Sequence, residues 1–220
     1  MSQYSAEMIE CPHCHHEGEF KVWTSINANL NPELREQILS EELFMFHCPY
    51  CGQTTGIPAG TVYHDMENKF MLFFEFFKPE DFNYSSSAIP KEVVEMRPDY
   101  KFRTVYGLME LKEKIITLEN ELDDIAVERF KYILGHVLIS TMAASDIKLY
   151  LVDVTEPDEE HKYGQLVFLF NDENNETQVL RLPKEKYFEH KYACSIDPRF
   201  SFEEGMCVDQ DLMDLKLREE

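Results

Sequence analysis

Two short cysteine motifs constrain this chain more than any other feature. The first reads CPHC at residues 11–14, and the second reads CPYC at residues 48–51. Two residues between cysteines let both thiolates of one turn face a single ion, and two such turns supply the four soft ligands of a tetrahedral zinc site. Proline stiffens each motif, and Gly52 allows the positive φ that turns backbone N–H groups toward sulfur. We therefore predict a zinc ion with four ligands: Cys11, Cys14, Cys48 and Cys51.

Four thiolates saturate zinc and leave no position for water, so we expect a structural rather than a catalytic metal. Other uses of the same cysteines stay open. Rubredoxin-type iron or an iron–sulfur cluster takes the same four sulfurs. A thioredoxin-like redox pair needs a helix directly after one motif, and residues 15–19 (HHEGE) do not begin one. Four histidines near the motifs could replace a cysteine or donate to sulfur, although polar surface positions explain them more simply: His13, His15, His16 and His47.

The charge of the chain bears on its partners. The formal net charge is −21, and both parts are acidic: residues 1–85 hold 13 acidic and 4 basic residues, and the remainder holds 29 and 17. Nucleic-acid binding draws on Lys and Arg side chains that neutralise phosphates, so we do not expect a nucleic-acid partner. Solubility is the simplest explanation of the acidity, and a protein partner with a basic surface is the sharper alternative.

The sequence shows no targeting or membrane signal. No stretch approaches the roughly 18 apolar residues of a membrane-spanning helix, and MSQYSAEMIE at the start does not resemble a signal peptide. We therefore expect a cytoplasmic protein without a membrane association, and in that reducing compartment paired cysteines bind metal more often than they form disulfides. The remaining cysteines, Cys194 and Cys207, are expected to be buried free thiols, with a redox-sensitive bridge as the alternative.

Residues 1–85 are predicted to form the first domain, a zinc-ribbon-like antiparallel sheet with a helical insertion. Two strands are expected at residues 19–26 (EFKVWTSI) and 42–48 (ELFMFHC), the second of which delivers the second cysteine motif. Between them, Asn31 as N-cap and Pro32 in the first turn predict a helix over residues 31–40. The segments TVYHD and KFMLFFEFF are expected to form a hairpin around MEN, and the second of them is apolar on both faces.

Residues 86–145 are predicted to be a connection followed by a long helix. Prolines, serines and charges without periodicity mark residues 79–104 as irregular. From Leu108 to Ile125 apolar residues recur every three or four positions with charges between them, and the pattern broadens as far as Leu138. We expect this apolar side of the helix to pack against the protein's own sheet, and a homodimer through residues 108–125 is the alternative.

Residues 146–220 are predicted to be a strand-rich α+β region. Strands at residues 147–154, 164–170 and 177–182 are separated by acidic turn-type segments, which is typical of an antiparallel β-meander. A short helix with Pro183 in its first turn and a last helix within DQDLMDLKLREE complete the chain. The whole chain is therefore expected to belong to the α+β class.

The chain resembles the CpXC domain family, an uncharacterised and mainly bacterial group defined by two Cys-Pro-x-Cys motifs. CPHC and CPYC match that pattern directly, and VWTSIN, NPELREQIL, LFMFHCPYCG and YHDMENKFM also fit it. The resemblance covers residues 8–135 and implies a zinc-binding module of unknown role, with no activity to transfer. It identifies only the four cysteines, as metal ligands.

Two functions are weighed for the chain. The first is a cytosolic zinc-binding adaptor or regulatory module that presents an acidic surface to a protein partner. The alternative is an enzyme, for example a hydrolase, with a site between the two halves near His64, where an imidazole precedes the carboxylate of Asp65. Adjacent strand residues face opposite sides, so this pair need not meet, and turn or surface positions are the simpler explanation.

Overall fold

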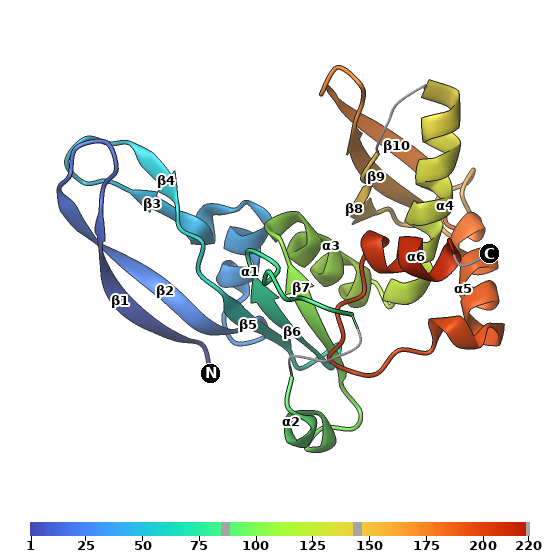
Figure 1. Ribbon diagram of the computed structural model, residues 1–220, viewed down its shortest axis with the longest axis horizontal. Coiled ribbons are helices and arrows are strands. Elements are labelled where there is room, and N and C mark those ends of the chain that lie inside the picture. Colours follow the sequence, from blue (N-terminus) through green and yellow to red (C-terminus); the bar gives the residue numbers. More distant parts are fainter. Residues whose placement is uncertain (85–88, 143–146, 219–220) are drawn as a thin grey trace. The chain divides into compact units, whose positions relative to one another are not determined.

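The computed structural model describes residues 1–84, 89–142 and 147–218, and it has a mixed α+β architecture (Figure 1). Its contacts divide the chain into two compact units, Met1–Leu108 and Met109–Glu220. The predicted domain boundaries at residues 85/86 and 145/146 lie outside the described residues.

The first unit is built on a five-stranded mixed sheet with the order β1-β2-β5-β6-β7. The pairs β1/β2 and β5/β6 are antiparallel, whereas β2/β5 and β6/β7 are parallel. The predicted antiparallel ribbon is therefore wrong for this sheet, and the zinc-ribbon-like description is not confirmed. The strands are β1 (Gln3–Glu10), β2 (Glu17–Asn27), β5 (Thr61–Asp65), β6 (Phe70–Glu75) and β7 (Lys101–Tyr106).

Parallel pairing follows from the long connections between these strands, since parallel neighbours need a crossover and cannot be joined by a tight turn. The crossover from β2 to β5 contains a helix and a second small sheet, and the crossover from β6 to β7 contains a short helix, α2 (Lys91–Glu95). The predicted hairpin of β5 and β6 is confirmed. The interior position of β6 also agrees with its apolar pattern, because Phe70, Leu72 and Phe74 are buried.

The crossover from β2 to β5 holds the predicted helix, α1 (Pro32–Leu39). Asn31 stands at the N-cap, but its side chain donates to Glu33 Oε1 instead of accepting from the helix. The strand expected over residues 42–48 is only partly present, because a 3-10 turn, η1 (Glu42–Phe44), precedes β3 (Met45–His47). Strand β3 pairs with β4 (Thr54–Gly56) in a separate antiparallel sheet, and the loop that joins these two strands contains the second cysteine motif.

The second unit confirms the predicted β-meander. Its antiparallel sheet has the order β10-β9-β8, with β8 (Tyr150–Val154), β9 (Gln165–Asn171) and β10 (Thr177–Pro183). Its helices are α3 (Leu108–Glu119), α4 (Asp124–Met142), α5 (Glu185–Ile196), the 3-10 turn η2 (Pro198–Phe200) and α6 (Gln210–Leu217). The core of this unit contains Val127 and Phe130 of α4, Phe168 of β9 and Tyr187 of α5.

The single long helix predicted from Leu108 is wrong, because the chain breaks between α3 and α4. Glu121 has φ +54° at the break, a left-handed conformation that a continuing helix does not use. Asp123 then accepts from the backbone N–H groups of Ile125 and Ala126 and so starts α4. The residues of the proposed dimer seam are largely buried within the chain: Leu111, Ile115, Leu118 and Leu122.

The described helices include none that is both long and apolar enough to cross a bilayer.

Candidate metal centre

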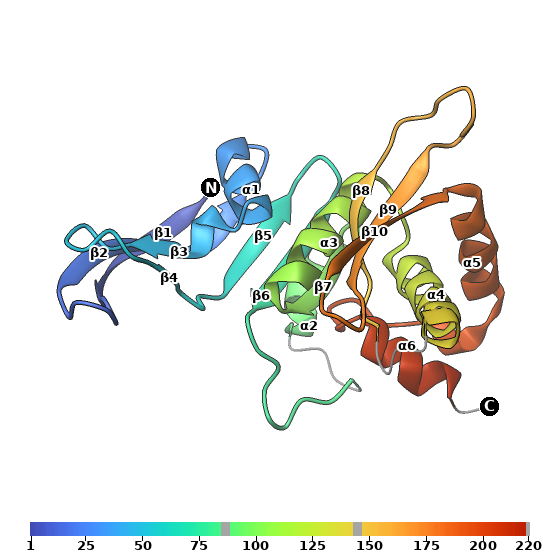
Figure 2. The same cartoon turned by 90° about the horizontal axis from the view of Figure 1, so that it is seen from above.

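The metal centre lies at the end of a two-stranded arm, which we define as residues 3–24. The arm contains β1, the first cysteine motif and most of β2, and only Ser25–Asn27 of β2 pair with β5. Figures 1 and 2 show this ribbon continuing beyond β5, β6 and β7, with β3 and β4 at its far part. A two-stranded hairpin is marginally stable in water, so the arm depends on what holds its far end.

Packing at the far end joins the two cysteine motifs. Phe46 of β3 is buried and meets Phe20 of β2 edge to face, with ring centroids 6.2 Å apart. Cys11 and Cys48 are buried in the same small cluster, against which Ile9 packs. We call the side of the arm that faces Phe46 its inner face. This cluster is small, and sulfur atoms form a large part of it.

Both motifs fold into the same type of turn. In the first, the N–H of His15 donates to the carbonyl of Cys11, and in the second the N–H of Gly52 donates to the carbonyl of Cys48. His15 and Gly52, the residues directly after each motif, have φ of +59° and +71°. Sequence reasoning anticipated the positive φ at Gly52 but missed the equivalent position at His15, where no glycine marks it.

The four sulfur atoms lie close together without being bonded. The Sγ atoms of Cys11 and Cys51 are 3.7 Å apart, those of Cys14 and Cys48 are 3.6 Å apart, and all four lie within 4.8 Å of one another. A zinc–sulfur bond of about 2.3 Å gives a tetrahedron with edges of about 3.8 Å. A disulfide needs about 2.05 Å, and all six cysteines are free thiols. The predicted ligands are therefore brought together with the spacing that one tetrahedral metal ion requires.

Backbone groups polarise this sulfur cluster. The backbone N–H of Cys51, and that of Tyr50, lower the pKa of the Cys48 thiol to about 6 despite desolvation. At Cys14 the His16 N–H lowers the pKa, but desolvation and the neighbouring thiols outweigh it and raise the pKa to about 12. One thiolate therefore forms readily, and its negative charge opposes the next ionisation. A divalent cation removes this conflict, because it stabilises all four thiolates at once.

The histidines near the motifs have other partners. His15 Nδ1 lies 2.8 Å from Glu10 Oε1, and His16 Nδ1 lies 3.1 Å from the carbonyl of Cys14. His47 lies between Thr54 and Glu42, with Nε2 2.6 Å from the Glu42 carboxylate. Among the described residues the sulfur cluster contains only cysteines, which agrees with the prediction of polar surface histidines.

The pair His64 and Asp65 is not joined by a hydrogen bond. His64 Nε2 lies 3.3 Å from the Tyr100 hydroxyl, whereas the buried Asp65 carboxylate accepts from the backbone and side chain of Asn68. Burial and the nearby Arg97 lower the pKa of His64, so the ring is neutral at pH 7. Asp65 therefore stabilises the β5–β6 turn, and the geometry does not provide His64 with an orienting carboxylate.

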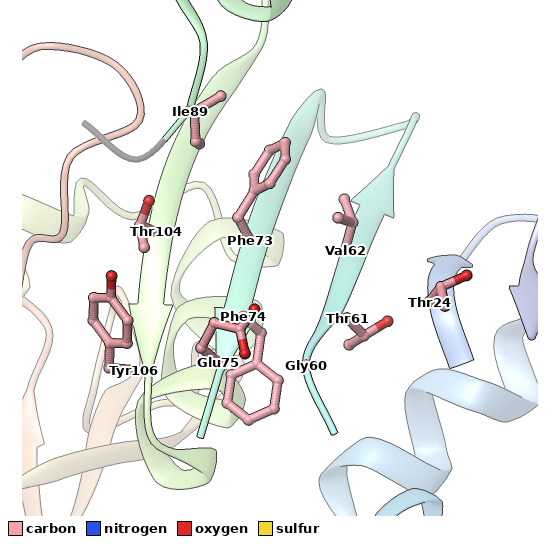
Figure 3. Close-up of a pocket in the computed structure, with 10 residues that line it drawn as sticks. All are labelled: Thr24, Gly60, Thr61, Val62, Phe73, Phe74, Glu75, Ile89, Thr104 and Tyr106. Carbon is pink, nitrogen blue, oxygen red and sulfur yellow. The ribbon is translucent and has the colours of Figure 1, made fainter. Parts of the chain in front are cut away.

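A cavity of about 300 Å³ opens on the sheet of the first unit (Figure 3). Its lining spans β2, β5, β6 and β7, and the Glu75 carboxylate lies directly over Gly60. Hydroxyls of Thr24, Thr61, Thr104 and Tyr106 supply most of its other polar groups. His64 is not part of this lining, so the cavity and the imidazole that motivated the hydrolase alternative do not form one site.

A second cluster of metal-ligating residues lies in the second unit, where oxygens of Glu110, Glu113 and Glu128 approach one another within 4.8 Å. The ammonium group of Lys131 already lies 2.5 Å from Glu113 and 2.8 Å from Glu128. This cluster is therefore a buried ion-pair network rather than a place for a metal ion. Cys194 and Cys207 do not form a disulfide, and Cys207 is buried and donates to Asp209.

The fold and the site define a mixed α+β protein with a four-cysteine cluster at the end of a β arm. The family model described as CpXC protein matches residues 9–131, which is more than half of the chain, and the chain therefore belongs to the CpXC family. The matched region includes all four cysteines and ends within α4, close to the end of the resemblance seen in the sequence. Neither the curated proteins nor the solved structures gave a match.

Gly18 provides a test of how tightly the two motifs pack. A Cβ atom at Gly18 would lie 2.9 Å from the Phe46 ring and 3.0 Å from Pro49 Cδ, whereas one at Gly56 in β4 would meet nothing within 4 Å. We expect Gly18→Ala to separate β3 from the arm and to lower the free energy of unfolding by about 1–3 kcal/mol. The measurement is thermal unfolding together with competition of each variant against a metal chelator. Gly56→Ala is the matched control, and equal behaviour of the two variants would contradict the packing model.

Proposed function

We propose that this protein is a cytosolic zinc-binding adaptor or regulatory module, in which the zinc ion has a structural role. The observation that supports this proposal is the cluster of four sulfur atoms at the far end of the arm. Its Sγ–Sγ distances are 3.7 Å between Cys11 and Cys51 and 3.6 Å between Cys14 and Cys48. These distances fit a zinc ion held by four thiolates. The same four sulfurs would also hold rubredoxin-type iron, so the metal requires direct measurement. A four-iron cluster needs more room between its cysteines than this spacing provides.

A structural role follows from the closed ligand set. Four thiolates leave no position for water or substrate, and a closed site contributes folding free energy instead of chemistry. The arm needs this contribution, since its strands are mostly exposed and its end contains only a small apolar cluster. The ion would link β1 and β2, through Cys11 and Cys14, to the loop between β3 and β4, through Cys48 and Cys51.

The interaction role is supported by charge and by exposure. The net charge of −21 disfavours nucleic acid and favours a partner with a basic surface. A rigid, exposed arm is a surface that a partner can reach. The cytosolic location is supported by six free thiols, since a reducing compartment keeps such cysteines available for metal.

Elemental analysis of full-length protein purified without added metal tests this function. We expect about one zinc per chain, and we expect a strong chelator to lower the melting temperature and to increase hydrogen exchange in β1–β4, because the arm loses its closing constraint. The β8–β10 meander is the internal control, and its exchange should remain slow. Iron in place of zinc, or zinc that leaves without any change in exchange, would contradict a structural zinc site.

A further inference from the structure

We propose that the outer face and the open edge of the arm bind a basic, extended segment of a protein partner, which adds to β1 as a further strand. This inference rests on the proposed function and specifies the surface and the chemistry of the partner. It is carried by the strand register, by the exposed aromatic and apolar side chains, and by the distribution of charge along the arm.

The register defines an uncovered outer face. Cross-strand partners lie on the same side of an antiparallel pair, and Gly18 and Phe20 face the Phe46 side. The alternate residues therefore form the outer face, and they pair in four steps: Tyr4 with Trp23, Ala6 with Lys21, Met8 with Glu19, and Glu10 with Glu17. The outer face is thus a ladder with aromatic side chains at one end and carboxylates at the other.

The aromatic end of this face is exposed to solvent. Tyr4 is 50% exposed and Met8 is 60% exposed, although both are large apolar side chains. The rings of Tyr4 and Trp23 pack against each other with centroids 4.9 Å apart, and Lys21 Nζ lies 4.8 Å from the centre of the Tyr4 ring. Tyr and Trp are the residues that most often dominate protein interfaces, because they bury a large area at a low cost in side-chain entropy.

The carboxylate end of this face favours a cationic partner. Glu10 and Glu17 lie directly opposite each other, a position in which like charges destabilise a strand pair, and of the two only Glu10 has a nearby basic group among the described residues, the exposed His15 ring at 2.8 Å. Glu19 follows on the same face, while the lysine of the arm lies over Tyr4. An Arg or Lys side chain placed beside Glu10 and Glu17 would relieve this repulsion. The register thus positions apolar contacts and a cation-binding end along one strand of eight residues.

The edge of β1 supplies the backbone part of the interaction. In the described sheet β1 is the terminal strand and pairs only with β2. An edge strand exposes a row of backbone N–H and C=O groups that another strand can pair with, and natural proteins usually protect such edges with Lys or Pro. The sequence of β1, QYSAEMIE, contains neither, and its charged residues, Glu7 and Glu10, would repel an acidic strand but not a basic one. Strand addition uses backbone hydrogen bonds for affinity and alternate side chains for specificity.

The charge of the arm distinguishes between possible occupants. The arm carries four glutamates and one lysine, so the arm of a second copy would bring together two surfaces of the same sign. Nucleic-acid phosphates meet the same repulsion. A basic protein segment is the occupant whose charge complements the arm, and its alternate positions should carry apolar side chains for Tyr4 and Trp23.

Trp23 is the only tryptophan of the chain, so its fluorescence reports directly on this surface. The zinc-containing full-length protein is titrated with an eight-residue Arg–Val peptide, in which alternate positions carry Val, Val, Arg and Arg and the remaining positions carry Thr, so that Val and Arg share one face of the added strand. We expect a saturable change of the Trp23 emission with this peptide and none with a Glu–Val peptide of the same length. A proline at the centre of the Arg–Val peptide should weaken binding at least about tenfold, because it removes a backbone donor and disrupts strand addition.

A matched pair of double variants distinguishes binding at the arm from binding that depends only on the net charge of the protein. Glu17→Gln with Glu19→Gln should weaken binding of the Arg–Val peptide at least about fivefold, whereas Glu67→Gln with Glu80→Gln, two exposed glutamates outside the arm, should leave it within about twofold. Zinc content and chelator sensitivity are measured on every sample. Zinc-loaded protein that fails to bind the peptide overturns this inference and leaves the proposed function standing, whereas protein without a structural zinc removes both.

Two further results would overturn the inference. Equal weakening by the two double variants would mean that the peptide binds through net charge alone. Concentration-dependent dimerisation that is lost when Met8 is replaced by Lys, measured by sedimentation without peptide, would identify a second copy as the occupant of β1.

Discussion

Replacing Cys48 by serine is expected to release the metal and to unfold the far end of the arm. Cys48 is buried, its sulfur lies 3.6 Å from that of Cys14, and backbone N–H groups already favour its thiolate. A serine hydroxyl is a harder and far less acidic ligand, so the site would keep three sulfurs. Structural zinc contributes on the order of 10 kcal/mol in small zinc domains, and losing one ligand should remove several kcal/mol of that free energy.

Metal content, thermal unfolding and hydrogen exchange measure this effect in full-length protein. We expect less than one zinc per chain, a lower melting temperature, and rapid exchange in β1–β4 with slow exchange in β8–β10. Cys194→Ser is the matched control, because Cys194 is a half-buried free thiol in α5, and it should change the free energy of unfolding by about 1 kcal/mol or less. A Cys48→Ser protein with full zinc content and an unchanged melting temperature would rule out the structural site.

The sulfur cluster was the most predictable part of the molecule. Two C-x2-C motifs carry their geometry locally, because each turn is four residues long and proline restricts it. What the spacing did not show is where the cluster lies. The sequence did not predict β1, because most of its residues are exposed and polar and apolar residues do not alternate along it; without β1 the arm could not be anticipated.

The parallel pairs of the first sheet could not be predicted from residue patterns. Strand β7 lies in a segment with prolines and charges, and Arg103 interrupts its apolar residues, yet that side chain is buried. The one sequence feature that indicates a strand here is that Phe102, Thr104 and Tyr106 occupy every second position and so share one face. Whether two strands pair in parallel or antiparallel depends on contacts between residues distant in sequence. Neither the hydrophobic periodicity of a strand nor its β propensity determines that direction.

The burial of charges in the second unit could not be predicted from the sequence for a related reason. Charged residues between apolar positions, as in residues 108–125, are typical of a helix with one side in solvent, but Glu113, Lys114 and Asp124 are buried. The later charges Asp124, Glu128 and Lys131 recur at helical spacing on one side of α4, which is the only local signal that they share a face. Their burial depends on α3 supplying charges of the opposite sign.

Replacing Lys131 by methionine is expected to destabilise the second unit by about 3–5 kcal/mol, because it leaves the buried Glu113 carboxylate without its cation and leaves Glu128 with Lys114 alone. Lys131 is fully buried and contacts Glu113 and Glu128, and Glu113 also accepts from the backbone N–H of Leu151 in β8 at 2.7 Å. Burial lowers the pKa of Lys131, but these carboxylates outweigh it and raise that pKa well above its usual value. The lysine is therefore charged in the folded protein.

The pH dependence separates lost charge from lost packing in the Lys131→Met variant. Burial raises the pKa of Glu113 to about 8 even with the lysine present, and removing the cation raises it further. A raised carboxyl pKa means that the folded state holds its proton more tightly than the unfolded state. The native protein and the variant should therefore lose stability alike as the pH rises from about 4.5 to about 8, and only the variant should continue to lose it above pH 8. The deficit of the variant relative to the native protein should be smaller at pH 5 than at pH 9.

A second substitution tests whether charge compensation restores stability. Glu113→Gln in the Lys131→Met background keeps an acceptor for the Leu151 N–H and removes one buried ionisable group, so denaturant unfolding should show recovery of about 1–2 kcal/mol at pH 9. Lys186→Met is the control, since Lys186 and Glu189 form an exposed pair that should contribute under about 1 kcal/mol. If the double variant is no more stable than Lys131→Met at both pH values, packing rather than charge balance stabilises this part of the unit. Recovery confined to high pH would instead show that α3 and α4 are joined through an ion-pair network in which each charge requires its partner.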